Sequence, residues 1–268
     1  MKPMVLTPQS VRKLGGIDVF PVSASQVQGT CLLLVSRGGG GKTTLAATVC
    51  DSEFVPHDQK NLYLDIEGNI QSIRHRTDCE FVPIADWDKF EVVVDAVIAG
   101  ETRGHYHTIT VDNISELIDI KIRDVFGTDK LDIEEQVSWP QWNRVTRDVL
   151  AKIRDLRNVS RRDGINIIFT AWDMADKKKP YYATIQANPA LYDKIPGILP
   201  FIGYIETDEK DQSRVLHFEY SNKHVSKWQC SPSDAAATVP LTFVIDIANG
   251  PHLGTVIDVV RGDKKWPK

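Results

Sequence analysis

A glycine-rich segment constrains the fold of this chain more than any other feature. It reads Ser36-Arg37-Gly38-Gly39-Gly40-Gly41-Lys42-Thr43-Thr44 and lies between an apolar run, Cys31 to Val35, and a helix-forming stretch, Leu45 to Val49. Glycines let the backbone curl closely around an anion, and the helix that follows presents its positive dipole end to the same anion. A strand, a glycine-rich loop and a helix in this order predict a loop that holds a polyphosphate.

The motif also predicts a role for each residue in the loop. We expect residues 36–44 to contact the nucleotide, with Lys42 reaching the β- and γ-phosphates and Thr43 holding Mg²⁺ through its hydroxyl. Ser36 stands where G-x-x-x-x-G-K-[ST] has its first glycine, and serine is small enough to fit there. A flexible glycine-rich turn is the alternative interpretation.

Apolar runs and helical patterns alternate along the chain, which favours a mostly parallel sheet covered by helices. The runs bounded by turns are Cys31 to Val35, Leu62 to Ile66, Phe81 to Ile84, Thr108 to Val111 and Ile165 to Thr170. Helical spacing occupies Trp87 to Ala99, Ile114 to Phe126 and Trp142 to Val159. The sequence therefore predicts an α/β fold.

The chain after Ala171 reads differently, because prolines at 180, 189, 196 and 200 predict turns there. Strands expected at Phe201 to Glu206 and Val215 to Tyr220 predict a hairpin-like extension of the sheet, and Leu241 to Ile247 is another expected strand. Residues beyond Gly250 read as a loosely attached end. We expect an N-terminal segment (1–27), a core (28–230) and a C-terminal strand with a basic tail (231–268).

Composition narrows the class of protein. No uninterrupted apolar stretch reaches the ~18 residues of a membrane span, and the N-terminus lacks the layout of a secretory signal, so we expect a soluble, cytoplasmic protein. The cysteines at 31, 50, 79 and 230 are far apart and form no C-x-x-C pair, which indicates neither a zinc site nor a disulfide framework.

The formal net charge of −4 means that any contact with nucleic acid must come from local basic clusters. Three clusters qualify: Arg154 to Arg162, Lys177 to Lys179, and the tail Lys264 to Lys268. Trp139 and Trp142 lie near the first cluster in the sequence. Basic groups combined with aromatic rings that stack on bases are typical of surfaces that bind single-stranded DNA. A solvated face is the alternative for each.

Carboxylates follow two of the expected strands. Asp112 ends the strand beginning at His107, where a Walker-B aspartate supports Mg²⁺, although an Asp before Asn113 could instead cap the next helix. Asp65 and Glu67 end another strand, at the edge where open α/β sheets bind ligands. We expect Glu67 to orient and deprotonate the attacking water.

The order of these motifs carries a family resemblance. The loop at 36–44, Asp65-Ile66-Glu67, Thr110-Val111-Asp112 and Ile168-Phe169-Thr170-Ala171-Trp172 together resemble the RecA-like ATPase core, and more narrowly the phage single-strand annealing ATPases of the Sak type. The resemblance covers about residues 28–230. It implies ATP and Mg²⁺ as cofactors, hydrolysis of ATP to ADP and phosphate, and action on single-stranded DNA in phage recombination or replication.

The resemblance also implies self-association as a ring or filament, with a single-strand-binding protein as a further candidate partner. RecA-like assemblies complete their site with a cation from the adjacent subunit; here Lys227 matches that position best and Lys223 second. Gln229 stands where an arginine is expected, and Trp172 where a polar sensor is usual.

Two other functions remain open from the sequence. Arg37, with Asp65 to Asn69, also resembles the ParA and MinD-type dimeric ATPases, in which Arg37 would replace a signature lysine. The chain could instead be a nucleotide-gated interaction module, in which ATP binding orders a surface for another protein and hydrolysis is incidental.

Overall fold

The computed structural model describes residues 12–14, 17–19, 29–127, 139–176, 182–208, 210–229, 238–262 and 266. In chain order, its strands are β1 (Arg12–Leu14), β2 (Ile17–Val19), β3 (Cys31–Ser36), β4 (Lys60–Asp65), β5 (Cys79–Pro83), β6 (Tyr106–Asp112), β7 (Asn166–Ala175), β8 (Ala183–Ile185), β9 (Phe201–Thr207), β10 (Arg214–His217), β11 (Lys227–Trp228) and β12 (Thr242–Val244). Its helices are α1 (Lys42–Ala47), α2 (Trp87–Ala99), α3 (Ile114–Phe126), α4 (Trp139–Asp163), α5 (Pro189–Ile198) and α6 (Leu253–Gly262), with 3₁₀ turns η2 (Thr48–Asp51) and η3 (Ile70–Ile73).

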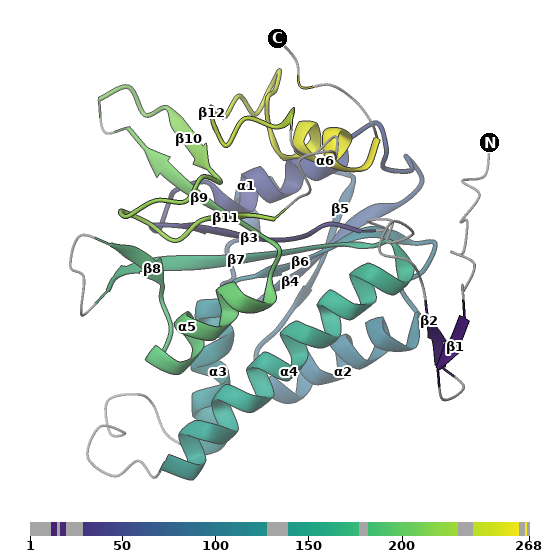
Figure 1. Ribbon diagram of the computed structural model, residues 1–268, viewed down its shortest axis with the longest axis vertical. Coiled ribbons are helices and arrows are strands. Elements are labelled where there is room, and N and C mark those ends of the chain that lie inside the picture. The colour runs from purple at the N-terminus through teal and green to yellow at the C-terminus, as the bar shows by residue number, and fades with distance from the viewer. Residues whose placement is uncertain are drawn as a thin grey trace.

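A mixed sheet forms the centre of the molecule (Figure 1). Its strand order is β12-β10-β9-β3-β7-β6-β4-β5, and the six strands from β9 to β5 are mutually parallel. β9 and β10 pair antiparallel, with Ile205 opposite Leu216. β12 pairs antiparallel with the other edge of β10. The predicted α/β class, a mostly parallel sheet with a hairpin extension, is confirmed.

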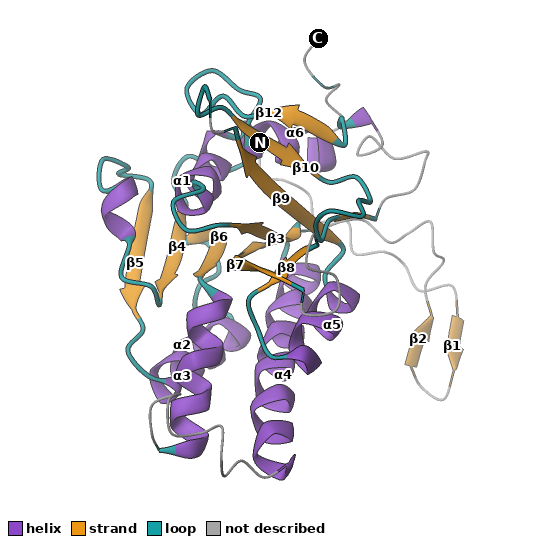
Figure 2. Cartoon of the chain, turned by 90° about the vertical axis from the view of Figure 1, so that its left-hand side faces the viewer, coloured by secondary structure: helices purple, strands orange, loops and turns teal. Residues whose placement is uncertain are grey.

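Helices cover both faces of the sheet (Figures 1 and 2). Side chains of a strand alternate between faces, so Leu33 and Val35 pack with α2, α3, α4 and α5, whereas Leu32 and Leu34 pack with α1 and α6. The central strand β3 is therefore buried on both sides, as its continuous apolar run predicts.

Parallel pairing gathers the ends of the central strands at one edge of the sheet. β3 ends at Ser36, directly before the glycine-rich loop, while β4 ends at Asp65 and β6 at Asp112. β7 lies between β3 and β6. The fold thereby brings the glycine-rich loop and the carboxylates of two other strands to the same edge.

Local capping signals explain why α2 and α3 occupy the predicted ranges. Asp86 accepts a hydrogen bond from the Lys89 amide at 2.8 Å, and Gly100 ends α2 with a left-handed backbone at φ 89°. Asn113 accepts from the Glu116 amide at 2.9 Å and begins α3 in the same way. Helix α4 extends the predicted 142–159 range at both ends.

The turns predicted around the later prolines are wrong for residues 189–198, which form α5. Pro189 occupies the first turn, where a missing N–H costs nothing, and Asn188 caps the helix by accepting from the Leu191 amide at 2.9 Å. Pro196 lies in the last turn, so the helix loses the one hydrogen bond that its amide would donate and ends two residues later. Strand β7 also continues five residues past its predicted end at Thr170, because β8 pairs with its extension.

The loosely attached end predicted beyond Gly250 is wrong for residues 253–262, which form α6. Leu253, Val256 and Ile257 are buried against the α1 side of the sheet. Ser52 of the segment after α1 donates to Asp258 at 2.5 Å. The predicted basic tail and Lys177 to Lys179 lie almost wholly outside the described residues, and the N-terminal segment is described only at β1 and β2.

Among the helices that the structure describes, none combines the length and the apolar character required to cross a membrane.

The packed position of α6 can be tested by cavity formation. Ile257 has no exposed surface, so Ile257→Ala should lower the free energy of unfolding by about 2 to 5 kcal/mol. Urea denaturation measures this change, and Val92→Ala, at a side chain that is 69% exposed, provides the control, with an expected change within about 0.5 kcal/mol. Equal losses in the two variants would contradict the packing described for α6.

Candidate nucleotide-binding site

The backbone of the glycine-rich loop folds tightly around the side chains of Ser36 and Lys42. Gly39 and Gly41 have left-handed backbones, with φ of 74° and 87°. A Cβ at Gly40 would lie 2.3 Å from Ser36 Oγ, which is closer than any real contact. Ser36 therefore fits in place of the motif's first glycine because the position it faces has no side chain.

Lys42 lies at the centre of the loop and is only 6% exposed. Its Nζ donates to the carbonyl oxygens of Ser36 at 3.2 Å and Arg37 at 3.1 Å, and to Ser36 Oγ at 3.2 Å. Burial lowers the pKa of Lys42, and the nearby carboxylates of Glu67, Asp112 and Asp173 raise it. The ammonium group is thus surrounded by oxygen atoms and by acidic groups from three strand ends.

Asp112 links the loop to the sheet. Its Oδ2 accepts from Thr43 Oγ1 at 2.6 Å, and its Oδ1 accepts from the Thr170 hydroxyl. Burial raises the pKa of Asp112, whereas the bonds from Thr170 and Thr43 lower it. Asn113, not Asp112, caps α3, so the capping alternative for Asp112 does not hold.

Glu67 lies beside Asp112 rather than in an isolated loop. Its carboxylate accepts from Asn69 Nδ2 at 2.6 Å and from Asn113 Nδ2, while the Glu67 and Ile66 amides both donate to the Asp112 carbonyl oxygen. Asp65 has a different role, because its Oδ1 accepts from the Gly68 amide at 2.9 Å and holds the turn after β4.

The donors gathered here fit a magnesium ion. Mg²⁺ prefers hard oxygen ligands, with one or two protein groups and the rest from water and phosphate. The Thr43 hydroxyl and the buried Asp112 carboxylate supply two oxygen atoms suitable as metal ligands. These atoms lie 2.6 Å apart, beside the loop expected to hold phosphate. They are the residues that would hold the ion.

Helix α1 begins before the expected stretch of Leu45 to Val49 and ends before that stretch ends. It comprises six residues, Lys42 to Ala47, and the chain continues as the 3₁₀ turn η2. Tyr63 of β4 holds its first turn by donating to the Thr43 carbonyl oxygen at 3.0 Å. A helix of six residues aligns few peptide dipoles, and Lys42 adds a full positive charge at the same end.

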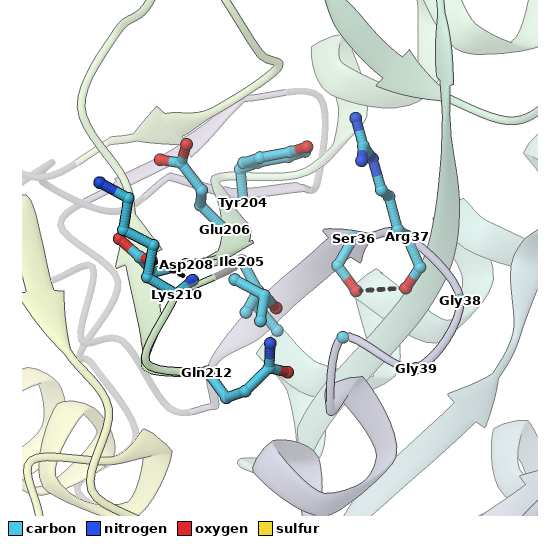
Figure 3. Close-up of a pocket in the computed structure, with 12 residues that line it drawn as sticks. Ser36, Arg37, Gly38, Gly39, Tyr204, Ile205, Glu206, Asp208, Lys210 and Gln212 are labelled. Carbon is cyan, nitrogen blue, oxygen red and sulfur yellow. Dashed lines mark hydrogen bonds between the residues drawn. The ribbon is translucent and has the colours of Figure 1, made fainter.

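A cavity of about 600 Å³ adjoins the loop (Figure 3). Ser36 to Gly40 form one wall, and the hairpin of β9 and β10 forms the other with Tyr204, Asp208 and Gln212. Its volume lies within the ~300 to 1,000 Å³ typical of small-molecule sites. The cavity therefore places room for a nucleoside-sized group beside the expected phosphate position.

Tyr204 and Arg214 lie beside the loop, and neither is predicted there from the sequence. Tyr204 donates to Asp173 Oδ2 at 2.8 Å, and its ring stacks on His224 with centroids 4.5 Å apart. A Cβ at Gly41 would lie 3.0 Å from Nε of Arg214, so this guanidinium lies against the start of α1. Asp173 follows Trp172 at the expected strand edge, where the sequence indicates both as candidate sensors of the γ-phosphate.

The lysines expected to act across subunits lie in β11 or shortly before it. Lys227 Nζ donates to the Pro196 carbonyl oxygen at 3.0 Å, at the end of α5. Lys223 is exposed on the segment before β11. Within the described chain, neither side chain forms a hydrogen bond or ion pair with residues 36–44. Trp172 is half-buried, and its amide donates to Ser115 Oγ at 3.1 Å.

The basic cluster on α4 is partly engaged with the protein itself. Arg157 donates to the Ile198 carbonyl oxygen at 3.3 Å, and Arg162 pairs with Asp163 at 2.6 Å. Trp142 packs against Phe126 with ring centroids 5.5 Å apart, which makes it a packing residue, whereas Trp139 is 81% exposed. Arg154 remains on the exposed face of the helix.

Comparison with known proteins places the chain in a family. No curated protein matches it. A solved structure of the RadB recombinase is similar with a TM-score of 0.47 and 14% sequence identity, over 73% of this chain and 83% of that chain. Residues 28–230, about three quarters of the chain, match the AAA domain family. The chain therefore belongs to the AAA domain family of P-loop NTPases.

Proposed function

We propose that this chain is an Mg²⁺-dependent, RecA-like ATPase of the phage Sak type, which acts on single-stranded DNA during recombination or replication in the host cytoplasm. One observation carries the ATPase part of the proposal: Lys42, the Thr43–Asp112 pair and Glu67 converge at one edge of the sheet. The family resemblance carries the DNA part.

In the proposed reaction, Glu67 orients a water molecule and takes its proton as the water oxygen attacks the γ-phosphorus. The bond from that phosphorus to the β–γ bridging oxygen breaks, so ADP and phosphate leave. Asn69 and Asn113 hold the Glu67 carboxylate in a fixed orientation. Lys42, which would exchange its bonds to Ser36 and Arg37 for bonds to phosphate, compensates the charge on the β- and γ-phosphates.

A magnesium ion held by Thr43 and Asp112 would supply charge neutralisation of the β- and γ-phosphate oxygens. Ser36, Arg37, the glycines at 38–41, and Thr44 complete the proposed nucleotide contacts. Their amides line the loop, and Arg37 adds an exposed cation beside the cavity.

Self-association would complete this site with a cation from an adjacent subunit, as a ring or filament. Of the two candidates, Lys223 is exposed, whereas Lys227 would first have to leave the Pro196 carbonyl oxygen. Charge developing on the transferred phosphate would favour such a cation. A single-strand-binding protein is a further candidate partner.

The α4 cluster supports contact with an anionic strand. Burial lowers the pKa of Arg157, and the neighbouring cations Arg161 and Arg154 lower it further. These three residues recur at helical spacing on one side of α4, so their mutual repulsion would be relieved by a phosphate backbone.

The first prediction separates binding from turnover. Lys42→Ala should weaken ATP binding by at least about tenfold, because it removes the central cation of the loop. Glu67→Gln should keep ATP affinity and lower turnover by about 10²- to 10⁴-fold, the range of general-base contributions. Equilibrium binding and phosphate-release assays measure the two quantities. Unchanged turnover in Glu67→Gln would remove Glu67 from the mechanism.

The second prediction tests the loop geometry. Gly40→Ala should weaken ATP binding, because its Cβ would overlap Ser36 Oγ at 2.3 Å. Gly197→Ala, in α5, is the matched control, since a Cβ there also meets no atom within 4 Å. The loss should shrink in a Ser36→Gly background, which a double-mutant cycle measures. Equal effects at Gly197 and Gly40 would contradict the described contact.

The third prediction concerns DNA. Single-stranded DNA should raise ATPase activity at low salt with Mg²⁺ present, and the affinity for DNA should fall steeply as salt rises, because phosphate contacts release counterions. Arg154→Glu should weaken binding more than Lys89→Glu, a control on the separate helix α2. Absence of stimulation by any DNA would favour the nucleotide-gated interaction module instead.

A further inference from the structure

Two cysteines separated by 29 positions in the sequence meet in the fold. Cys50 lies in η2, which follows the loop helix α1, and Cys79 is the first residue of β5. Their Sγ atoms are 4.0 Å apart. Because α1 and η2 run back along the sheet from the end of β3, this pair lies near the starts of the parallel strands, opposite the edge that holds the nucleotide-binding loop. Cysteine spacing alone did not indicate it.

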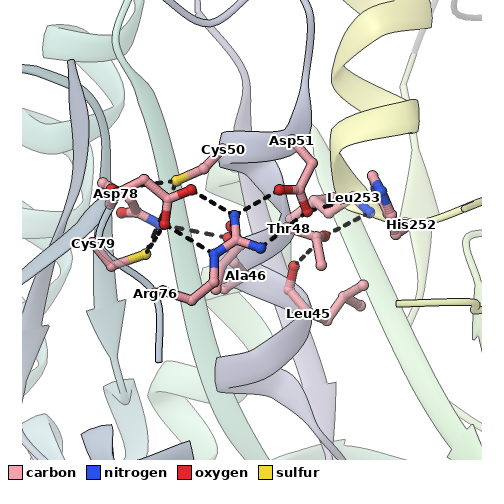
Figure 4. A network of polar contacts seen from close by, with 12 residues as sticks. Leu45, Ala46, Thr48, Cys50, Asp51, Arg76, Asp78, Cys79, His252 and Leu253 are labelled. Atoms are coloured by element: carbon pink, nitrogen blue, oxygen red, sulfur yellow. Dashed lines mark hydrogen bonds and ion pairs between the residues drawn. The ribbon is translucent and has the colours of Figure 1, made fainter. Parts of the chain in front are cut away.

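A carboxylate completes the group (Figure 4). Asp78 precedes Cys79 and accepts from its thiol at 3.7 Å through Oδ1, while the Cys50 thiol contacts the Asp78 carbonyl oxygen at 3.6 Å. One ligand atom from each of Cys50, Asp78 and Cys79 lies within 4.8 Å of the other two. Two sulfur atoms and one oxygen therefore lie close enough together to share one ion.

The spacing suits a tetrahedral metal ion better than a disulfide. Two thiolates bound to Zn²⁺ at about 2.3 Å are about 3.8 Å apart, close to the observed separation of the sulfur atoms. A disulfide would require the same atoms to approach to about 2.05 Å. Only the first arrangement is reached with a shift of a few tenths of an ångström from 4.0 Å.

The charge around the group is also balanced for a divalent cation. Arg76 donates from Nε to Asp78 Oδ1 at 2.9 Å and from Nη2 to Asp78 Oδ2 at 2.8 Å, and it pairs with Asp51 as well. It orients the Asp78 carboxylate in the way that outer partners orient metal ligands. Two thiolates and one carboxylate would carry three negative charges against the ion's two, and Arg76 would offset the excess.

An independent observation points to a ligand at this place. His107, at the start of β6, is 5% exposed, and its Nδ1 contacts Thr108 Oγ1 at 2.7 Å. Its Nε2 is buried and has no nitrogen or oxygen partner in the described part of the chain. The imidazole lies beside Cys50: the hydrogen bond with Cys79 and burial raise the pKa of the Cys50 thiol, and a hydrogen bond with His107 lowers it. His107 therefore places an imidazole nitrogen next to one of the two sulfur atoms.

The group is accessible from outside the protein. Both thiols are partly exposed. A cavity of about 290 Å³ lies alongside, lined by Arg76, Cys79, Glu80 and Phe81, and Phe81 is 52% exposed. An ion could therefore reach the sulfur atoms without unfolding of the core.

We propose that Cys50, Cys79 and Asp78 bind a thiophilic divalent cation of the Zn²⁺ type, with His107, which interacts with the Cys50 thiol, as the candidate for the fourth position. Binding replaces the two thiol protons, which pass to solvent, by two metal–sulfur bonds, and no oxidant is involved. The ion would connect η2 to the start of β5, and so fix the far end of the loop helix to the edge of the sheet.

Cobalt titration of the full chain tests the proposal. Reduced, metal-stripped protein should develop a thiolate-to-cobalt absorption band when Co²⁺ is added, and Zn²⁺ should abolish the band by displacement. Cys50→Ser and Cys79→Ser should each weaken Co²⁺ binding at least about tenfold. Cys31→Ala, which changes the buried cysteine of β3, should leave the titration as in the unmodified chain.

A second measurement needs no substitution. Zn²⁺ should protect Cys50 and Cys79 from alkylation, as read from peptide masses, in the folded full chain. The proposal is overturned if excess Co²⁺ produces no band, if the band persists in both serine variants, or if the two thiols are alkylated equally with and without Zn²⁺. Formation of a Cys50–Cys79 disulfide in preference to metal binding would overturn it too.

Discussion

The buried carboxylate of Asp112 is the interaction on which the rest of the structure depends. It accepts hydroxyl hydrogen bonds from Thr43 and Thr170, and so connects the first turn of α1 to β7 and β6. A carboxylate that is 2% exposed would be costly without such partners. The glycine-rich loop is therefore held at the sheet edge by polar contacts as well as by the burial of β3.

Around this contact, the loop and the neighbouring strand ends are interdependent. Ser36 leaves no room for a side chain at Gly40. Lys42 donates hydrogen bonds to three oxygen atoms of Ser36 and Arg37. Asn113 caps α3 with its oxygen and contacts Glu67 with its amide nitrogen. The Asn113 side chain thus both caps α3 and holds the proposed catalytic carboxylate, so a substitution of Asn113 would affect the start of α3 and the orientation of Glu67 together.

The sequence predicts those parts whose signals are local. The bounds of α2 and α3 follow from a capping residue at one end and a left-handed glycine at the other, and both signals lie within the helix's immediate neighbours. The phosphate loop and its lysine are likewise a contiguous motif. Asp112 and Glu67 could be placed at one edge because parallel strands end together.

Contacts between distant segments could not be read in this way. Tyr204 and Arg214 reach the loop only because β9 lies beside β3 and β10 pairs with β9, an order that strand patterns do not specify. Cys50 and Cys79 read as unrelated packing residues for the same reason. The α5 helix was missed because two prolines suggested turns, although one occupies the first turn and the other the last.

The position of α6 has a consequence for how the protein is made. Leu253 donates its amide to Thr48 at 3.1 Å across 205 positions of sequence, and Ser52 pairs with Asp258 across 206. Closing such long loops is slow, because the chain entropy is lost before the contacts form. During synthesis, the apolar side of α1 and η2 would stay uncovered until residues 253–262 have left the ribosome, and exposed apolar surface of this kind makes folding intermediates prone to aggregate.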